Sequence, residues 1–291
     1  MRKIVLLSAL LLSALALCGT SAYAKKEKAS LMSFNIRIQI SADTGEHNWE
    51  SRKEGCVKAI RKHDPDILGL QEATTEQKSF IMRELPKHTI IDGSNKPGTV
   101  NNESESGFNP ILFRTDKFEL LDYGTLWLNE NQAQGMKGWD SEYVRSANWV
   151  KLRFRKSGQI IFYFNTHLDN TGARSRQESS SLIVGKIKEI AGDDAVVILS
   201  GDLNATSSDK TIRPLTSYFK EASKTVRKAD KTSSFNDFGR KGQNTGSIDH
   251  ILFRNAEAES FNVVDERKYG IRYISDHYPV TAGFIIKLPK D

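Results

Sequence analysis

Polar side chains with catalytic or metal-binding chemistry recur where short apolar runs of this sequence end. They are Asn35, Glu72, His167, Asp202, Asn204, Asp249, His250, Asp276 and His277. A single acid after an apolar run is usually a solvated loop residue, so no one position is informative alone. The repetition is informative, because strand ends at one edge of a sheet lie close together and bring distant residues into one site.

The residue types in this set favour metal-assisted hydrolysis of a phosphoester. Carboxylates and carboxamides are hard oxygen ligands suited to Mg²⁺ or Mn²⁺, and the absence of cysteine from the set argues against structural zinc. Glu72 with Asn35 matches the sparse protein ligation that Mg²⁺ needs. The remaining acids and histidines of the set would then activate water and stabilise developing negative charge.

Other catalytic classes lack their defining motifs. The sequence has no Gly-x-Ser-x-Gly elbow, no P-loop and no His-Glu-x-x-His helix, which disfavours a serine hydrolase, an NTPase and a zincin. A glycosidase could use paired acids, but it would leave the two histidines and the motif Asp202-Leu203-Asn204 unexplained.

Strands and helices that alternate along the chain must position these residues. Apolar runs at 30–34 and 66–70 predict strands, with a helix between them at about 50–62. Thr74 and Gln77 have the spacing of a capping box that opens a second helix. Further elements are a hairpin of strands at 150–155 and 160–165, helices over 183–190 and 212–219, and strands at 195–199, 251–253 and 280–286. Hairpins mixed with crossovers favour an α+β fold with helices outside the sheets.

Composition excludes several classes of protein. The 291 residues are 38% hydrophobic and 27% charged, which rules out a wholly disordered chain, a collagen-like fibre and a polytopic membrane protein. A net charge of +6 permits an anionic substrate without requiring a nucleic acid. We find no internal repeat and no proline-rich linker, so we expect a single catalytic domain at 25–291.

Residues 1–24 are typical of a secretory signal. Arg2 and Lys3 precede an apolar segment, and Ala22-Tyr23-Ala24 is a small-x-small cleavage site. Cys18 raises a lipid anchor as the alternative, but a leucine precedes it where such cysteines usually follow a small residue, so we favour simple cleavage. We therefore expect export to a periplasmic, extracellular or cell-surface location, no stable membrane span, and Cys56 as a free buried thiol.

Six short motifs resemble, in order, the motif series of the endonuclease/exonuclease/phosphatase superfamily. They are Phe34-Asn35-Ile36-Arg37, Leu70-Gln71-Glu72, Asn165-Thr166-His167-Leu168, Gly201-Asp202-Leu203-Asn204, Ile248-Asp249-His250-Ile251 and Ser275-Asp276-His277. The resemblance implies a deoxyribonuclease-I-like fold, a four-layer α/β/β/α sandwich of two packed mixed sheets flanked by helices. Residues 35–53 and 165–169 further resemble a secreted bacterial subgroup of metal-dependent hydrolases.

The resemblance implies that Glu72, assisted by Asn35, holds a divalent metal, with Asp276 beside it. The expected cofactor is Mg²⁺ or Mn²⁺. Outside the motifs, Arg145 and Arg174 are candidate ligands of the substrate phosphate, because a guanidinium binds phosphate bidentately. A surface ion pair is the open alternative for each arginine.

The catalytic roles follow from the same resemblance. Asp202 would orient or deprotonate the attacking water, and Asn204 would position the phosphate. His277 would contact the scissile phosphate with Asp249 behind it, and His167 would stabilise the pentavalent transition state. In physical terms, in-line attack needs an oriented water, a cation, and donors where charge accumulates.

Three functions remain open on the sequence. The first is a phosphomonoesterase or phosphodiesterase acting on a small or sugar-linked phosphate; the second is a secreted nuclease; the third is a binding protein that has lost catalysis. The third is disfavoured because every expected catalytic position is filled. A nuclease should carry a basic groove, yet we interpret the nearest basic cluster, Lys151, Arg153 and Arg155, as a solvated strand face. We expect a monomer that takes a phosphate ester and does not require nucleic acid.

Overall fold

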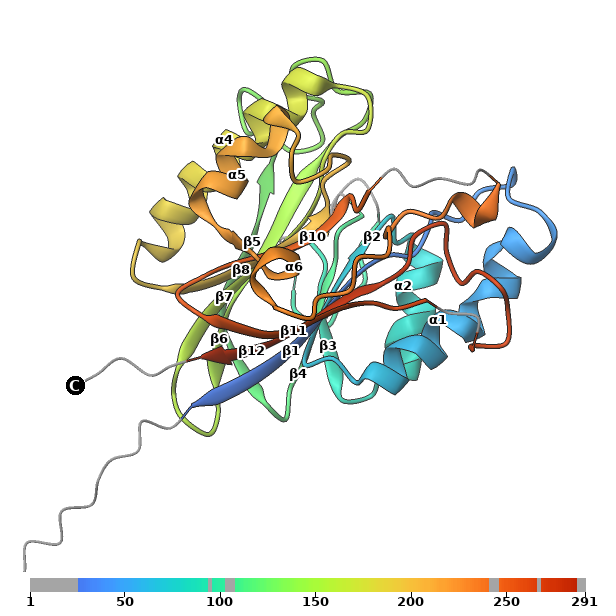
Figure 1. The fold of residues 1–291 in the computed structure, drawn as a ribbon, viewed down its shortest axis with the longest axis horizontal. Coiled ribbons are helices and arrows are strands. Elements are labelled where there is room, and N and C mark those ends of the chain that lie inside the picture. Colours follow the sequence, from blue (N-terminus) through green and yellow to red (C-terminus); the bar gives the residue numbers. More distant parts are fainter. Residues whose placement is uncertain (1–25, 94–95, 103–107, 241–245, 266–267, 287–291) are drawn as a thin grey trace, which may run out of the picture.

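Two mixed β-sheets pack face to face between outer helices. The computed structural model describes residues 26–93, 96–102, 108–240, 246–265 and 268–286. In this part of the chain each sheet has six strands, and helices cover both outer faces (Figure 1). The predicted four-layer arrangement is confirmed. The predicted signal at 1–24 lies outside the described residues.

The first sheet carries the N- and C-terminal strands side by side. Its strands, in spatial order, are β11 (Glu257–Val263), β12 (Val280–Ile286), β1 (Glu27–Asn35), β2 (Ile67–Gln71), β4 (Ile111–Arg114) and β3 (His88–Ile91). β1 and β2 are parallel and the other neighbours are antiparallel. The outer face is covered by α1 (Trp49–His63), which follows the short helix η1 (Gly45–His47), and by α2 (Thr75–Glu84). The capping box of Thr74 and Gln77 opens α2 as predicted.

The second sheet is built mainly from the middle of the chain. Its strands, in spatial order, are β5 (Phe118–Trp127), β6 (Ser146–Phe154), β7 (Ile160–His167), β8 (Val196–Asp202), β10 (Asp249–Arg254) and β9 (Lys220–Glu221). Among the described strand pairs of this second sheet, only β7 and β8 are parallel to each other. The helices after β7 are α4 (Ala173–Ala191), η2 (Lys210–Ile212), α5 (Arg213–Tyr218), α6 (Ala222–Thr225) and η3 (Asp237–Gly239). Figure 1 shows α4 and α5 on the outer side of this sheet.

Three apolar clusters hold the layers together. The central one lies between the sheets, where Phe253 of one sheet meets Phe284 of the other with ring centroids 5.2 Å apart. The two outer clusters pack α1 and α2 on the first sheet, and α4 and α5 on the second. Burial on both faces explains why β1, β2 and β8 read as short continuous apolar runs rather than alternating ones.

The strands that the sequence did not indicate have weak patterns. β5 and β11 each contain a register shift, and an extra residue in a strand breaks the two-residue alternation. β3 and β4 have four residues each, too few for periodicity to be informative. As expected, Cys56 is buried and free, and its thiol donates to the Ile274 carbonyl at 3.2 Å. No helix among the described residues is both long and apolar enough to cross a bilayer.

Candidate active site

The polar strand ends of both sheets meet at one edge of the sandwich. Asn35 and His167 are the last residues of β1 and β7, and Asp202 is the last residue of β8. Antiparallel neighbours contribute their first residues to the same edge, so Asp249 of β10 pairs in register with Asp202. His277 lies just before β12, whose first residues pair with the end of β1. The predicted convergence is therefore a consequence of strand direction.

Asn35 connects two carboxylates from different sheets. Its Nδ2 donates to Glu72 Oε1 and to Asp202 Oδ2, both at 3.1 Å. Its Oδ1 accepts the backbone N–H of Arg37 at 3.0 Å, so Asn35 presents its amide nitrogen to the acids. The other oxygen of Glu72 accepts the N–H of Ile38 at 2.9 Å. This arrangement fixes the spacing between Glu72 and Asp202.

Asp276 forms the third acid of this group. Its carboxylate accepts from Ser275 Oγ at 3.2 Å and lies 3.6 Å from the guanidinium of Arg37. Burial, aided by the charge of Glu72, raises the pKa of Asp276, although His277 and Arg37 oppose the shift. An added cation would relieve this concentration of buried negative charge.

His277 and Asp249 form a buried hydrogen-bonded pair. His277 Nδ1 lies 2.7 Å from Asp249 Oδ2, and its Nε2 lies 3.7 Å from Asp202 Oδ2. Burial alone would lower the pKa of His277, but the charges of Asp249 and Asp202 outweigh it and hold that pKa well above its usual value. These two carboxylates favour the imidazolium form, in which Nε2–H is available as a donor.

His167 and Asn204 lie on the other side of Asp202. Asn204 Nδ2 donates to the Leu168 carbonyl and to His167 Nε2, both at 3.0 Å, and the Asn204 N–H donates to Asp202 Oδ1 at 2.9 Å. Burial, with the positive charges of Arg145 and His277, lowers the pKa of His167 well below its usual value. One neutral and one charged imidazole thus flank Asp202.

Asp202 has the environment of a group that exchanges a proton near neutrality. Burial and the neighbouring charge of Asp249 raise the pKa of Asp202 to about 7, against the opposing effects of His277 and of the hydrogen bonds from Asn204 and Asn35. A carboxylate whose pKa lies near the working pH is suited to accept a proton from water.

The donor set fits a hard divalent cation. Donor atoms of Asp202, Asp249 and His277 all lie within 4.8 Å of one another, so these three residues can hold an ion. Asp249 Oδ1 is buried and has no hydrogen-bond partner among the described residues. Glu72 and Asp276 add carboxylate oxygens beside this group. Oxygen-rich sites of this kind suit Mg²⁺ or Mn²⁺ better than zinc.

Unusual backbone conformations cluster at this edge. Arg37 (φ 60°), Glu72 (φ 60°) and Asn204 (φ 47°) are all in the left-handed region, which is costly for residues other than glycine. Gly201 lies directly before Asp202, and a Cβ there would overlap the Thr166 carbonyl. The sharp turns at the strand ends therefore aim the functional side chains into the site.

The two arginines predicted to bind phosphate are placed differently. The half-buried Arg145 donates to Asp169 Oδ2 at 3.3 Å, stacks over the Tyr143 ring, and is close enough to His167 to influence its pKa. Arg174 is exposed in the first turn of α4, where its backbone N–H donates to Asp140. The structure thus brings Arg145, but not Arg174, to the group.

Two supporting residues were not singled out for such a role from the sequence. The fully buried Arg52 donates to the carbonyls of His47 and Ile36 at 2.7 Å and of Ile274 at 2.8 Å. It ties the loop after β1 to the segment before Asp276. The available signal was that Arg52 stands three residues after Trp49, within the stretch that resembles the bacterial subgroup. The partners of Arg52 are main-chain carbonyls, which cannot be predicted from a sequence.

Asn165 joins the two sheets directly behind the site. Its Nδ2 donates to the carbonyls of Leu70 and Pro110 at 2.7 and 3.0 Å, and its Oδ1 accepts from Gln71 Nε2 at 2.7 Å. Asn165 belongs to one of the six motifs, yet its contacts are structural. It sets the separation between β7 and β2 at the edge where His167 and Glu72 emerge.

Comparisons with known proteins agree with this geometry. The sequence profile described as "Endonuclease/Exonuclease/phosphatase family" matches residues 32–277. Among solved structures, an endonuclease/exonuclease/phosphatase from Bacteroides vulgatus is 31% identical with a TM-score of 0.80, and the match covers 90% of this chain and all of that one. The mannosyl-6-phosphatase of Bacteroides thetaiotaomicron is 26% identical with a TM-score of 0.77, over 88% of this chain and 99% of that one.

Curated relatives are more distant. An uncharacterized protein of Acanthamoeba polyphaga mimivirus is 24% identical in an alignment of 257 residues that covers 82% of this chain and 92% of that protein. Nocturnin of Drosophila melanogaster is 26% identical over 64% of this chain, and the match spans 30% of Nocturnin.

Proposed function

Because the chain belongs to the endonuclease/exonuclease/phosphatase family, whose members are phosphoric ester hydrolases, we propose that it hydrolyses a small or sugar-linked phosphate ester with Mg²⁺ or Mn²⁺. The observation that carries this proposal is the convergence of Glu72, Asp202 and His277 at one sheet edge, with each acid and imidazole held by a named partner.

The proposed reaction is attack of water on phosphorus. The water oxygen forms the new P–O bond and the bond from phosphorus to the leaving oxygen breaks. The leaving oxygen takes a proton from solvent, so that inorganic phosphate or a phosphomonoester leaves with an alcohol. Asp202 accepts the proton of the water, since its pKa lies near 7 and its carboxylate is held by Asn35 and Asn204.

Glu72 and Asp276 are the proposed metal ligands, with Asn35 holding Glu72 in place. The triad of Asp202, Asp249 and His277 is the alternative ion site. We favour the carboxylates, because His277 Nδ1 already pairs with Asp249 at 2.7 Å and because carboxylate oxygens are the ligands that Mg²⁺ prefers. A bound divalent ion neutralises charge on the phosphate oxygens and helps to activate water.

The remaining residues are proposed to stabilise the transition state. His277 Nε2–H donates to a non-bridging phosphate oxygen, with Asp249 keeping the ring charged and oriented. Asn204 and His167, already in contact with each other, border the phosphate on the other side, where Asn204 fixes the position of the His167 ring. Arg145 adds a positive charge next to His167, whereas Arg174 has no assigned part in the reaction.

A small or sugar-linked substrate is favoured over a nucleic acid by two observations. The similar Bacteroides thetaiotaomicron protein is named a mannosyl-6-phosphatase. The basic cluster on β6 gives little support to a backbone track, because Arg153 is paired with Glu119 at 2.8 Å and Lys151 stacks on Phe162. Export of the protein is also proposed, on the signal-like sequence of residues 1–24.

The test is hydrolysis of a panel of phosphomonoesters, phosphodiesters, nucleic acids and phospholipids, followed as phosphate release for the monoesters and as cleavage products for the other substrates. We expect turnover of small phosphate esters that EDTA abolishes and that Mg²⁺ or Mn²⁺ restores. Cleavage of DNA or RNA with no turnover of small esters would replace the proposed substrate class by a nuclease. Undiminished turnover in EDTA would contradict the proposed metal dependence.

A further inference from the structure

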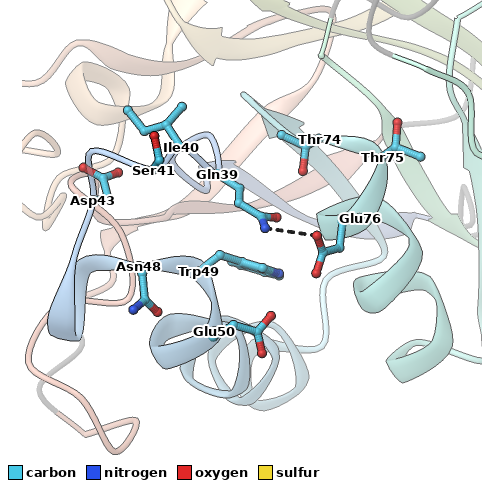
Figure 2. A pocket seen from close by; sticks show the side chains of 10 residues that line it. All are labelled: Gln39, Ile40, Ser41, Asp43, Asn48, Trp49, Glu50, Thr74, Thr75 and Glu76. Carbon is cyan, nitrogen blue, oxygen red and sulfur yellow. Dashed lines mark hydrogen bonds between the residues drawn. The ribbon is translucent and has the colours of Figure 1, made fainter.

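A pocket of about 600 Å³ borders the carboxylate side of the site. It is lined by the loop after β1, the first turn of α1 and the first turn of α2 (Figure 2). Its lining residues are Gln39, Ile40, Ser41, Asp43, Asn48, Trp49, Glu50, Thr74, Thr75 and Glu76. None of the residues given above for metal ligation or phosphate chemistry is among them.

Two walls of the pocket lie close along the chain to groups at the proposed metal site. Gln39 follows Ile38, whose N–H holds Glu72, and Thr74 lies only two residues after Glu72. Two residues of chain span at most about 7 Å, so these walls begin next to Glu72, a proposed metal ligand. On the far side, Asp43 is held at 2.8 Å by Arg37, which also reaches Asp276. A group esterified to that phosphate would extend into this pocket.

The charge of the lining excludes a second phosphate. Three of the ten lining residues are acids, and none of these described residues is Lys, Arg or His. Two of the acids are neutralised, Asp43 by Arg37 at 2.8 Å and Glu50 by Lys53 at 2.5 Å. Glu76 instead accepts from the amide of Gln39 at 3.0 Å. The pocket is therefore polar and weakly anionic, which repels a polyphosphate or a nucleic-acid backbone.

The donors and acceptors match hydroxyl groups. Figure 2 shows the Gln39–Glu76 pair bridging the loop and α2, with the Trp49 indole beside it. The Gln39 carbonyl and the second oxygen of Glu76 can each accept from a hydroxyl, and a carboxylate makes the stronger, charge-assisted bond. Ile40 is 38% exposed and offers an apolar surface to the C–H face of a ring.

We propose that this pocket binds the uncharged, hydroxyl-rich part of the substrate, so that the enzyme selects hexose phosphates over aryl phosphates and nucleotides. The inference rests on the proposed phosphoester hydrolysis and names the leaving group that this site accepts. Gln39 and Glu76 supply the specificity through bonds to sugar hydroxyls.

The test compares Gln39→Ala and Glu76→Gln with wild type on hexose 6-phosphates and on p-nitrophenyl phosphate, whose leaving group carries no hydroxyl. Each variant should lower the ratio of kcat/KM on the hexose phosphate to kcat/KM on p-nitrophenyl phosphate about tenfold, mainly by raising KM for the hexose phosphate. This is the scale of losing one hydrogen bond in Gln39→Ala, or the charge that strengthens one in Glu76→Gln. Gln177→Ala, exposed on α4, is the matched control. Melting temperatures of all three report whether the fold is retained.

The outcomes separate this inference from the proposed function. No phosphoester turnover by wild type would remove the function itself. Turnover by wild type with an unchanged ratio in both variants would overturn the pocket assignment alone, as would equal losses on both substrates. Phosphocholine is assayed as a third substrate. If the two variants lose kcat/KM on phosphocholine and not on the hexose phosphates, the ligand of the pocket is a cationic group rather than a hydroxyl-rich one.

Discussion

At the scale of single residues, the site is organised around Asp202. Its two oxygens receive hydrogen bonds from Asn35 and from the Asn204 backbone, and both imidazoles lie within 3.7 Å of it. Asp202 and the two imidazoles have displaced pKa values, because burial is opposed or reinforced by a close charge. Displaced pKa values that gather in one polar site mark candidates for reacting groups.

Asp249→Asn should shift the pH dependence of catalysis. The Asp249 carboxylate raises the pKa of His277, so its loss should lower that pKa and leave less imidazolium at neutral pH. The alkaline limb of the kcat/KM profile should move to lower pH by the same amount. The exposed Asp194→Asn is the control. An unmoved alkaline limb in a folded Asp249→Asn enzyme would contradict the role of this pair.

The buried pair of His250 and Glu221 should make stability depend on pH. Their atoms lie 3.1 Å apart; each pKa shift opposes burial, raising that of His250 and lowering that of Glu221. A raised histidine pKa contributes stability that is complete below 6.5 and lost as pH rises through the folded value. A lowered glutamate pKa contributes stability that is present above 4.5 and lost in acid.

The pair therefore contributes most between pH 4.5 and 6.5. The free energy of unfolding of His250→Gln, measured with denaturant at several pH values, should differ most from wild type in that window. The difference should narrow above the folded pKa of His250. A difference that is constant from acid to alkaline pH would show that the pair acts only through packing.

At the scale of elements, strand direction determined which part of the site the sequence could predict. Polar residues at the ends of apolar runs were assigned to one edge correctly, because parallel strands end together and antiparallel neighbours begin there. The contacts of Asn165 and Arg52 were not predictable, since their partners are main-chain carbonyls brought close only by the packing of two sheets. The strands β5 and β11 were not predicted, because the bulge in each strand breaks the two-residue alternation of apolar and polar side chains.

Asn165→Ala should loosen the contact between the two sheets. It removes the donor to the Leu70 and Pro110 carbonyls and the acceptor for Gln71, all buried. Loss of such buried partners should lower the free energy of unfolding by roughly 3 kcal/mol. Asn131→Ala, exposed in a loop, is the comparison. A loss below about 1 kcal/mol would mean that water replaces the missing amide.

At the scale of the whole molecule, the small positive charge of the chain contrasts with the acidic edge of the sandwich. The net charge is +6, yet Glu72, Asp202, Asp249 and Asp276 gather within one site. The distribution of charge, rather than its total, therefore decides what binds. A divalent cation and a phosphate ester complement this edge together, because each offsets the charge of the other.

Mg²⁺ should stabilise the folded protein if it binds this acidic edge. A ligand that binds only the folded state raises the melting temperature as its concentration exceeds its Kd. The rise in 10 mM Mg²⁺ should be a few degrees for wild type. Glu72→Gln should lose most of it, and Glu257→Gln on the exposed strand β11 should not. An equal rise in all three proteins would place the ion elsewhere.

The most direct test of the central claim is phosphate release by Asp202→Ala beside wild type and Asp194→Ala, on a hexose 6-phosphate with Mg²⁺. The account predicts a kcat at least about 10²-fold below wild type for Asp202→Ala, since the proton acceptor and the Asn35 contact are both lost, and normal turnover for Asp194→Ala. Near-normal kcat in folded Asp202→Ala would contradict the claim that this strand end is the hydrolytic centre.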